Sequence, residues 1–342
     1  RSVAIVLAAL AGLGAALALG ADGPSDAVPA AALTLAVLAL ALTALVATHA
    51  IAAAAGDPSH GPAAPGIGTA WRALVAVATG IAIAGCLSST VADALAKEGR
   101  VAWEDQVAAW RARGDLGRAE ALLDGAERRY RRAAALAPWS PRYRLALGMA
   151  ADVRGDLRTQ QWMADTRRAA ADAVGNAAGA PQRDAVVRRD AAFEAAIEHF
   201  AAAMRLAPGD PTAALALARA WRLWGDLTDE PARRADRLDH ARAAYAAARA
   251  LAPRWPEVIA ESATVELLDG RPAVARELAE TAVALDGYYY QGWKTVAAAR
   301  AAGGDAAGAA DAWRRYFADP RNAGDVAALR ARAAAALQAG DT

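Results

Sequence analysis

Four neighbouring aromatic residues have side chains suited to binding a ligand: Tyr288, Tyr289, Tyr290 and Trp293. An exposed aromatic ring beside polar groups such as Gln291 and Lys294 can stack on a sugar ring or on a peptide. Adjacent positions of a helix differ by about 100°, so at least one of three consecutive tyrosines is expected to be exposed. We therefore predict a binding site at these four residues. The alternative is structural: Tyr290 and Trp293 would pack between helices while Tyr288 and Tyr289 line a turn.

Catalytic and metal chemistry has no recognisable pattern in the sequence. The chain contains no GxGxxG or GxSxG motif, no Walker loop and no pair of catalytic carboxylates. Its single cysteine, Cys86, excludes a disulfide within the chain and a thiolate metal site. None of the four histidines belongs to an HExxH motif or a similar ligand pair. We expect no catalytic residue, no metal site and no cofactor in this segment.

The charge of the chain excludes one class of partner. With 38 basic and 37 acidic residues the net charge is +1, so there is no positive field to attract nucleic acid. Basic clusters lie beside acidic residues, as on a solvated helix face. We predict no nucleic-acid partner.

The elements that would position a binding site are indicated by a phrase that occurs three times with constant spacing. Its positions are Ala126, Tyr130, Ala133, Leu136, Pro138 and Pro141; Ala196, Phe200, Ala203, Leu206, Pro208 and Pro211; and Ala241, Tyr245, Ala248, Leu251, Pro253 and Pro256. The small and aromatic residues fall on one face of a helix. The first proline cannot continue this helix, and the second suits the first turn of the next one. The unit is therefore a helix, a tight turn and another helix.

Two weaker copies follow, and the spacing identifies the repeat. They comprise Ala275, Ala279, Ala282 and Leu285, then Ala309, Trp313 and Tyr316. The steps between anchor alanines are 70, 45, 34 and 34 residues, and a tetratricopeptide repeat has 34. We attribute the 45-residue step to a polar insert at 226–236. We allow a degenerate repeat at about 154–187 in the 70-residue step, broken by a loop at 175–181. The prediction for residues 97–342 is a tetratricopeptide-type α-solenoid.

The first 96 residues have a different composition and carry only six formal charges. Three apolar runs, at about 2–19, 30–55 and 73–94, are each long enough to cross a hydrocarbon core of roughly 30 Å. We therefore predict an all-α chain in which a membrane domain at 1–96, with three transmembrane helices, precedes the solenoid. The lipid bilayer is then a partner. The alternatives are buried helices of a soluble protein, or a signal peptide in the first run.

The few basic residues near these runs predict an orientation. Arg1 and Arg72 place the chain start and the loop at 56–70 in the cytoplasm, which makes the repeat domain extracytoplasmic. Lys97 and Arg100 favour the opposite orientation. His49 lies near the end of the second run, where an ionisable group is either functional or, as a neutral imidazole, reaches the interface.

The order of these parts resembles the C-terminal part of bacterial O-antigen ligase/polymerase-like membrane proteins that end in tetratricopeptide repeats. The resemblance covers essentially the whole chain. It rests on the Leu-Ala-Pro closures and the stretch at 214–227, combined with the preceding membrane runs. It implies a bacterial plasma-membrane protein that transfers a glycan from an undecaprenyl-diphosphate carrier to an acceptor. A chain that starts with Arg and enters a membrane run at once is expected to be the end of a longer protein.

The resemblance also implies essential arginines and a histidine in extracytoplasmic loops. The two loops present contain no arginine and only His60, so no catalytic residue is carried over. Our leading hypothesis is the C-terminal portion of an O-antigen ligase-like glycan transferase. Its repeats would bind a protein or glycan acceptor on their concave face, and its missing membrane part would bind the undecaprenyl-linked glycan. One alternative is a non-enzymatic, membrane-anchored tetratricopeptide scaffold for protein–protein interaction. Another is a secretion or pilus-assembly adaptor.

Overall fold

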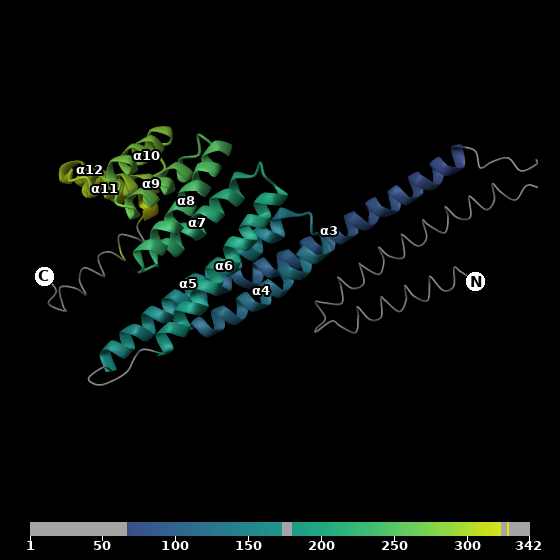
Figure 1. Ribbon diagram of the computed structural model, residues 1–342, viewed down its shortest axis with the longest axis horizontal. Helices are drawn as coiled ribbons and strands as arrows, with labels where there is room; N and C mark the ends of the chain where they lie inside the picture. Colours follow the sequence, from purple (N-terminus) through teal and green to yellow (C-terminus); the bar gives the residue numbers. More distant parts are fainter. Residues whose placement is uncertain (1–66, 173–179, 323–326, 328–342) are drawn as a thin grey trace, which may run out of the picture. The chain divides into compact units, whose positions relative to one another are not determined.

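The computed structural model describes residues 67–172, 180–322 and 327. Every regular element in these ranges is helical: ten α-helices, labelled α3 to α12, and a 3-10 helix at Pro320–Asn322 (Figure 1). The all-α prediction is therefore confirmed for the described residues. The chain divides into two compact units, Arg1–Ala150 and Ala151–Thr342.

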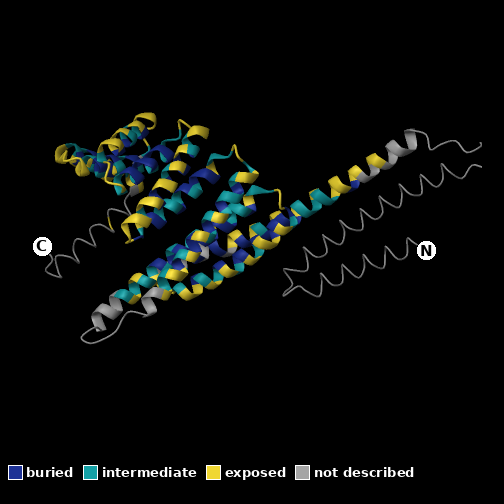
Figure 2. Ribbon diagram, viewed as in Figure 1, coloured by how far each residue is buried: buried dark blue, intermediate teal, exposed yellow. Residues whose placement is uncertain are grey.

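In the first unit, α3 (Ile67–Ala112) pairs with α4 (Leu116–Leu136). The pairing begins at Val91 on α3, where buried residues start to recur. Trp103 Nε1 donates a buried hydrogen bond of 2.7 Å to Tyr130 Oη, which joins the two helices. Between Leu74 and Thr90, the described side chains of α3 are mostly exposed or half-buried (Figure 2). One helix thus has a packed half and an unpacked apolar half.

The unpacked half of α3 bears on the predicted membrane spans. The described residues contain one helical segment long and apolar enough to cross a membrane, Ala78–Val101, of which 22% is buried. It overlaps the third predicted span at 73–94. The first two predicted spans, with His49 and His60, lie outside the described residues. The predicted domain boundary at residue 97 falls inside α3, which continues without interruption to Ala112.

The second unit is a series of helix pairs. After α5 (Pro141–Asp172) come α6 (Ala180–Leu206), α7 (Pro211–Asp226), α8 (Pro231–Leu251), α9 (Pro256–Leu268), α10 (Pro272–Leu285), α11 (Tyr290–Ala302) and α12 (Ala306–Ala318). The starts of α9 and α11 are 34 residues apart, and so are those of α10 and α12. Each of these pairs contacts the next. This arrangement confirms a solenoid with the 34-residue period of tetratricopeptide repeats.

The repeated phrase produces the same turn at each junction between pairs. The backbone N–H groups of Ser140, Asp210, Trp255 and Tyr289 each donate to the carbonyl three residues earlier, at 3.0–3.2 Å. The second proline then opens α5, α7 and α9, as predicted. At the fourth junction Gly287 replaces the first proline and the turn is retained. Local sequence therefore fixes these connections.

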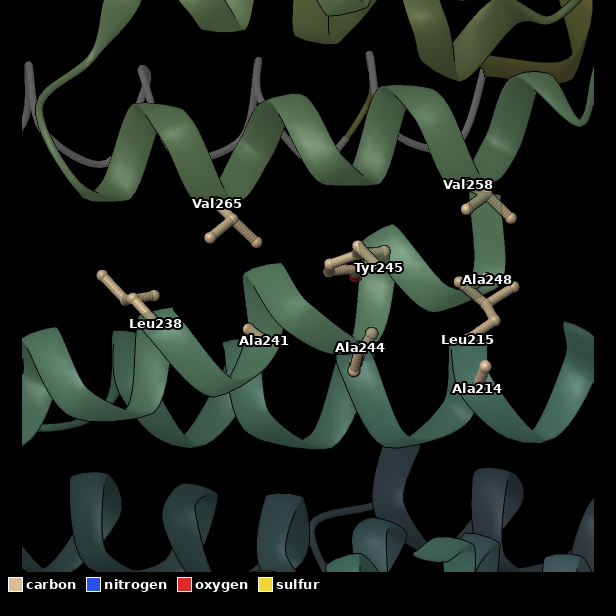
Figure 3. Packing of buried hydrophobic residues seen from close by; sticks show 10 residues of the cluster. Ala214, Leu215, Leu238, Ala241, Ala244, Tyr245, Ala248, Val258 and Val265 are labelled. Carbon is tan, nitrogen blue, oxygen red and sulfur yellow. The ribbon is translucent and has the colours of Figure 1, made fainter. Parts of the chain in front are cut away.

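The core of the solenoid consists of the predicted small and aromatic residues. Tyr245 is 1% exposed and lies with Val258 and Val265 between α8 and α9, while Ala241 and Ala244 face α7 (Figure 3). Small side chains let helix axes approach closely, and one aromatic ring per pair fills the remaining space. Removing that ring from a close-packed core typically costs about 3–5 kcal/mol.

The structure does not contain the degenerate repeat that we allowed at about 154–187, within the 70-residue step. α5 is a single helix of 32 residues and α6 has 27, so this step is one long pair. Residues 173–179, which include most of the predicted loop, lie outside the described residues. The Gly-Asp pair at 155–156 looks like a turn signal, but Gly155 stays helical. A Cβ there would lie 3.0 Å from the Phe193 ring, so this glycine permits close packing of α5 and α6.

The polar insert of the 45-residue step is mostly helix. α7 and α8 have 16 and 21 residues, against 13 and 14 in α9 and α10. The added length of α8 is about two turns, which keeps its buried face in register. Arg237, the residue after the insert, is buried: its guanidinium carbon lies 3.6 Å from the Trp224 ring centroid, and it donates to Thr228 Oγ1 within the insert. The insert therefore supplies the short connection at 227–230, where Thr228 is buried, and the first residues of α8.

Candidate functional site

A groove of about 560 Å³ lies across α7, α9 and α11, the first helices of three successive pairs. Its polar lining residues are Arg222, Glu257, Glu261, Thr264, Gln291, Lys294 and Thr295. Ala260, Leu267 and Ala298 give it apolar surface, and Tyr289 forms part of its wall. We call it the first-helix groove.

The sequence of α9 determines what the groove presents. Glu257, Glu261 and Thr264 follow the i, i+4, i+7 spacing of a single helix face. On the opposite side, Val258 and Ala263 are fully buried against neighbouring helices. Because the apolar positions must be buried, the carboxylates and the hydroxyl are left to line the groove.

A charge cluster holds one side of the groove. Arg219 of α7 donates to both oxygens of Glu261, at 2.5 and 2.8 Å, and also binds Glu257. The hydrogen bond with Glu261 is the main cause that raises the pKa of Arg219 above its ordinary value. Tyr245 Oη donates to Glu261 Oε2 at 3.0 Å, and burial raises the pKa of that hydroxyl. These carboxylates are therefore fixed in place before any ligand arrives.

A second charged group extends the cluster toward α5. Asp152 Oδ1 is buried and has no hydrogen-bond partner among the described residues. Burial, with the nearby charge of Asp156, raises the pKa of the Asp152 carboxyl from 3.8 to about 6. The charges of Arg222 and Arg219 act in the opposite direction. The protonation of Asp152 therefore changes within the range of mild acid.

The structure separates the four predicted aromatic residues. Tyr289 lines the groove, whereas Tyr288 is 84% exposed on the turn before α11. Tyr290 opens α11, and its side chain lies outside the described residues. Trp293 is half-buried against the core of the last pairs, where its Nε1 donates to Gly287 O at 3.3 Å and Arg315 lies over its ring. Two of the three tyrosines precede the helix, so the helical argument applies only from Tyr290 onward.

Gly292 positions the tyrosine that does line the groove. A Cβ at this residue would lie 2.7 Å from Val283 Cγ1 and 2.9 Å from Tyr289 Cδ1. Only the hydrogen atom of a glycine fits at residue 292, between Val283 of α10 and the Tyr289 ring. The glycine therefore lets Tyr289 fold back over the first turn of α11. Tyr289 then packs beside the Ile259 and Ala260 cluster while keeping one side on the groove.

Sequence reasoning missed most of the groove. Glu257, Glu261 and Arg222 belong to no recognisable motif. The helical spacing of polar residues along α9 was the available signal for Glu257 and Glu261. Lys294, noted only as a polar neighbour of the tyrosines, is exposed in the groove and has no ion-pair partner in the part of the chain that the structure describes. No group of three potential metal ligands occurs among the described residues. Cys86 is exposed on α3.

Comparison with known proteins gives similarity at the level of solved structures. No protein-family model matches the chain, and no curated protein matches its sequence. A crystal structure of MamA is 16% identical over 67% of this chain and 96% of that one, with a TM-score of 0.38. The TPR protein TTC0263 of Thermus thermophilus is 15% identical over 68% and 96%, with a TM-score of 0.44. PilF of Pseudomonas aeruginosa is 16% identical over 69% and 99%, with a TM-score of 0.31. At these values the fold assignment rests on the helix packing described above.

Proposed function

We propose that this chain is a membrane-anchored helical-repeat scaffold whose first-helix groove binds a segment of a partner protein. The observation that carries the proposal is the groove itself, which spans three successive repeats. It offers fixed carboxylates, a lysine with no ion-pair partner among the described residues, an aromatic wall and apolar surface. Such a mixture suits a peptide, which has charged, apolar and backbone groups to satisfy at once.

The rigidity of the groove supports binding. Arg219 holds Glu257 and Glu261 in one geometry, so little side-chain freedom remains to be lost on association. Lys294 has no such partner within the described ranges and is available to an acidic group of the ligand. We therefore expect the bound segment to carry an acidic residue.

Membrane anchoring is proposed from α3. The twenty residues between Arg72 and Asp93 are uncharged, which matches a hydrocarbon core of roughly 30 Å. The hydroxyls of Thr79, Ser88 and Thr90 donate to backbone carbonyls of the preceding turn, at 2.8–3.0 Å, so they need no water. The proposed location is the bacterial plasma membrane, with the repeats on its extracytoplasmic side.

Photo-crosslinking tests the groove. A benzophenone amino acid at Lys294 should crosslink a protein partner in the native membrane, whereas the same group at Arg276, exposed on α10, should not. Thr264→Arg, which fills the groove from α9, should abolish the crosslink. Equal crosslinking at both sites, or a crosslink that survives Thr264→Arg, would contradict the proposal.

A glycan-transfer role remains a second proposal, suggested by the resemblance to O-antigen ligases. The observation that favours it is Tyr289 in the groove beside Gln291 and Lys294, a combination that can stack on and hydrogen-bond a sugar. The same crosslinking experiment separates the two. A partner removed by protease supports the scaffold, and one removed by acid hydrolysis of glycan supports the transferase.

A further inference from the structure

A second pocket lies in the first unit, where α3 passes from its unpacked half to its packed half. It has a volume of about 420 Å³ and lies between α3, α4 and the first turns of α5. Asp93, Lys97 and Arg100 line it from α3 at i, i+4 and i+7, which is one helix face. Arg142 and Tyr143 line it from the start of α5.

The charges of this pocket are not balanced. Tyr143 Oη donates to Asp93 Oδ1 at 2.8 Å, and Arg142 lies 3.6 Å from the same oxygen, so the carboxylate is already engaged. Lys97 and Arg100 are exposed and have no ion-pair partner among the described residues. The charged lining residues together have a net charge of +2. The pocket is therefore suited to an anion.

The surroundings of the pocket narrow the kind of anion. The uncharged segment of α3 ends at Ala92, immediately before Asp93, and it carries exposed apolar side chains: Leu74 is 59% and Ile81 is 61% exposed. A free phosphate has no apolar part that could contact this surface. A lipid needs both parts, because its acyl chains require an apolar neighbour and its headgroup requires a cationic one.

We propose that this pocket binds the phosphate headgroup of an anionic phospholipid whose acyl chains lie along the apolar segment of α3. The inference rests on the proposed membrane anchoring by α3. Basic residues at a membrane surface increase affinity for anionic lipids by about fivefold each. The bound lipid would fix the depth at which α3 leaves the bilayer and therefore the height of the first helix pair above it.

Native mass spectrometry of the full chain in detergent tests the site with two defined lipids. Dioleoyl-phosphatidylglycerol and dioleoyl-phosphatidylcholine are added in equal amounts. We expect preferential retention of phosphatidylglycerol, and Lys97→Gln with Arg100→Gln should weaken its binding about 25-fold without changing the binding of phosphatidylcholine. The matched control is Arg128→Gln with Arg132→Gln, the same change of charge on exposed residues of α4 outside the pocket, which should retain the preference.

Two outcomes would overturn the proposal: equal retention of both lipids by the wild type, or equal loss of preference in the control. Circular dichroism confirms that each variant is folded. Carbonate extraction of native membranes distinguishes a failure of the headgroup-site proposal from a failure of the proposed membrane anchoring. An extracted chain contradicts the proposed anchoring, whereas a resistant chain without lipid preference contradicts only the headgroup site.

Discussion

Arg219 illustrates how single residues set the properties of the first-helix groove. Its guanidinium is paired with Glu257 and Glu261, so it contributes geometry and little free charge. Lys294, in contrast, is unpaired among the described residues and contributes charge. Asp152 contributes a titratable group behind the same cluster. Three charged side chains in one region thus have three different physical roles.

Asp152→Asn should remove part of the pH dependence of stability. Since the folded pKa of about 6 lies above the ordinary 3.8, the native state binds more protons than the unfolded chain between these values. The free energy of unfolding should therefore fall as the pH rises through this window, by at most about 3 kcal/mol. Asparagine should flatten this slope and increase stability at neutral pH.

The measurement for Asp152 is urea unfolding of the full chain in detergent at several pH values from mild acid to neutral. Asp229→Asn, an exposed carboxyl in the turn after α7, is the control and should leave the slope unchanged. If Asp152→Asn gives the same slope as the wild type, the carboxyl is not the group that titrates.

Gly292→Ala should destabilise the second unit by about 1–3 kcal/mol, because the added methyl group meets Val283 and Tyr289. Gly287→Ala is the control, since its nearest neighbouring atom is 3.9 Å away. Val283→Ala should recover part of the loss in the double variant, which chemical denaturation can measure as a coupling energy. Additive effects of the two substitutions would show that they do not share the space.

At the scale of elements, the turns inside the helix pairs repeat as regularly as the turns between them. Gly270 and Gly304 are 34 residues apart and have φ angles of 72° and 82°. After each glycine, the next backbone N–H donates to a carbonyl five residues earlier, at 2.8 and 2.9 Å. This is the Schellman ending of a helix, which favours glycine because a Cβ is strained in the left-handed region.

Gly304→Ala should therefore cost about 1–2 kcal/mol, even though its Cβ would meet no neighbouring atom. Gly303→Ala is a matched control in the same turn, because its φ of −84° is ordinary for alanine. Thermal unfolding of the two variants measures the difference. Equal destabilisation would mean that the left-handed conformation is not the cause.

At the scale of the whole molecule, α3 connects the proposed membrane anchor to the first helix pair without a loop. The exposed apolar half and the packed half are one continuous helix from Ile67 to Ala112. Any tilt of the anchor would then be transmitted to α4 through the contact of Trp103 with Tyr130. A flexible linker would not do this.

The single cysteine provides a direct test of this arrangement. Cys86 lies in the uncharged segment and is exposed on the helix, so a water-soluble maleimide should label it rapidly if α3 is in water. We expect no labelling in sealed vesicles and full labelling after denaturation. Arg276→Cys, on the repeat domain, is the control and should react when the reagent is on its side of the membrane. Rapid labelling of Cys86 in intact vesicles would contradict the anchor.

Much of the solenoid was predictable because its signals are local. Leu136, Pro138 and Pro141 fix a helix end, a turn and a helix start within six residues, and this pattern repeats. Where the same kind of signal failed, packing decided. The Gly-Asp pair at 155–156 looks like a turn, yet Gly155 stays within α5 and lies close against the Phe193 ring of α6.

The sequence by itself determined the all-α class, the 34-residue period, the junction turns and an apolar segment long enough to span a membrane, since each depends on neighbouring residues. Tertiary structure decided which side chains share a site. Glu257, Arg219 and Tyr289 come from α9, α7 and the turn before α11, and no spacing along the chain relates them. It also separated Tyr288 from Tyr289 and packed a half-buried Trp293 against the core, because burial depends on neighbours that are distant in sequence.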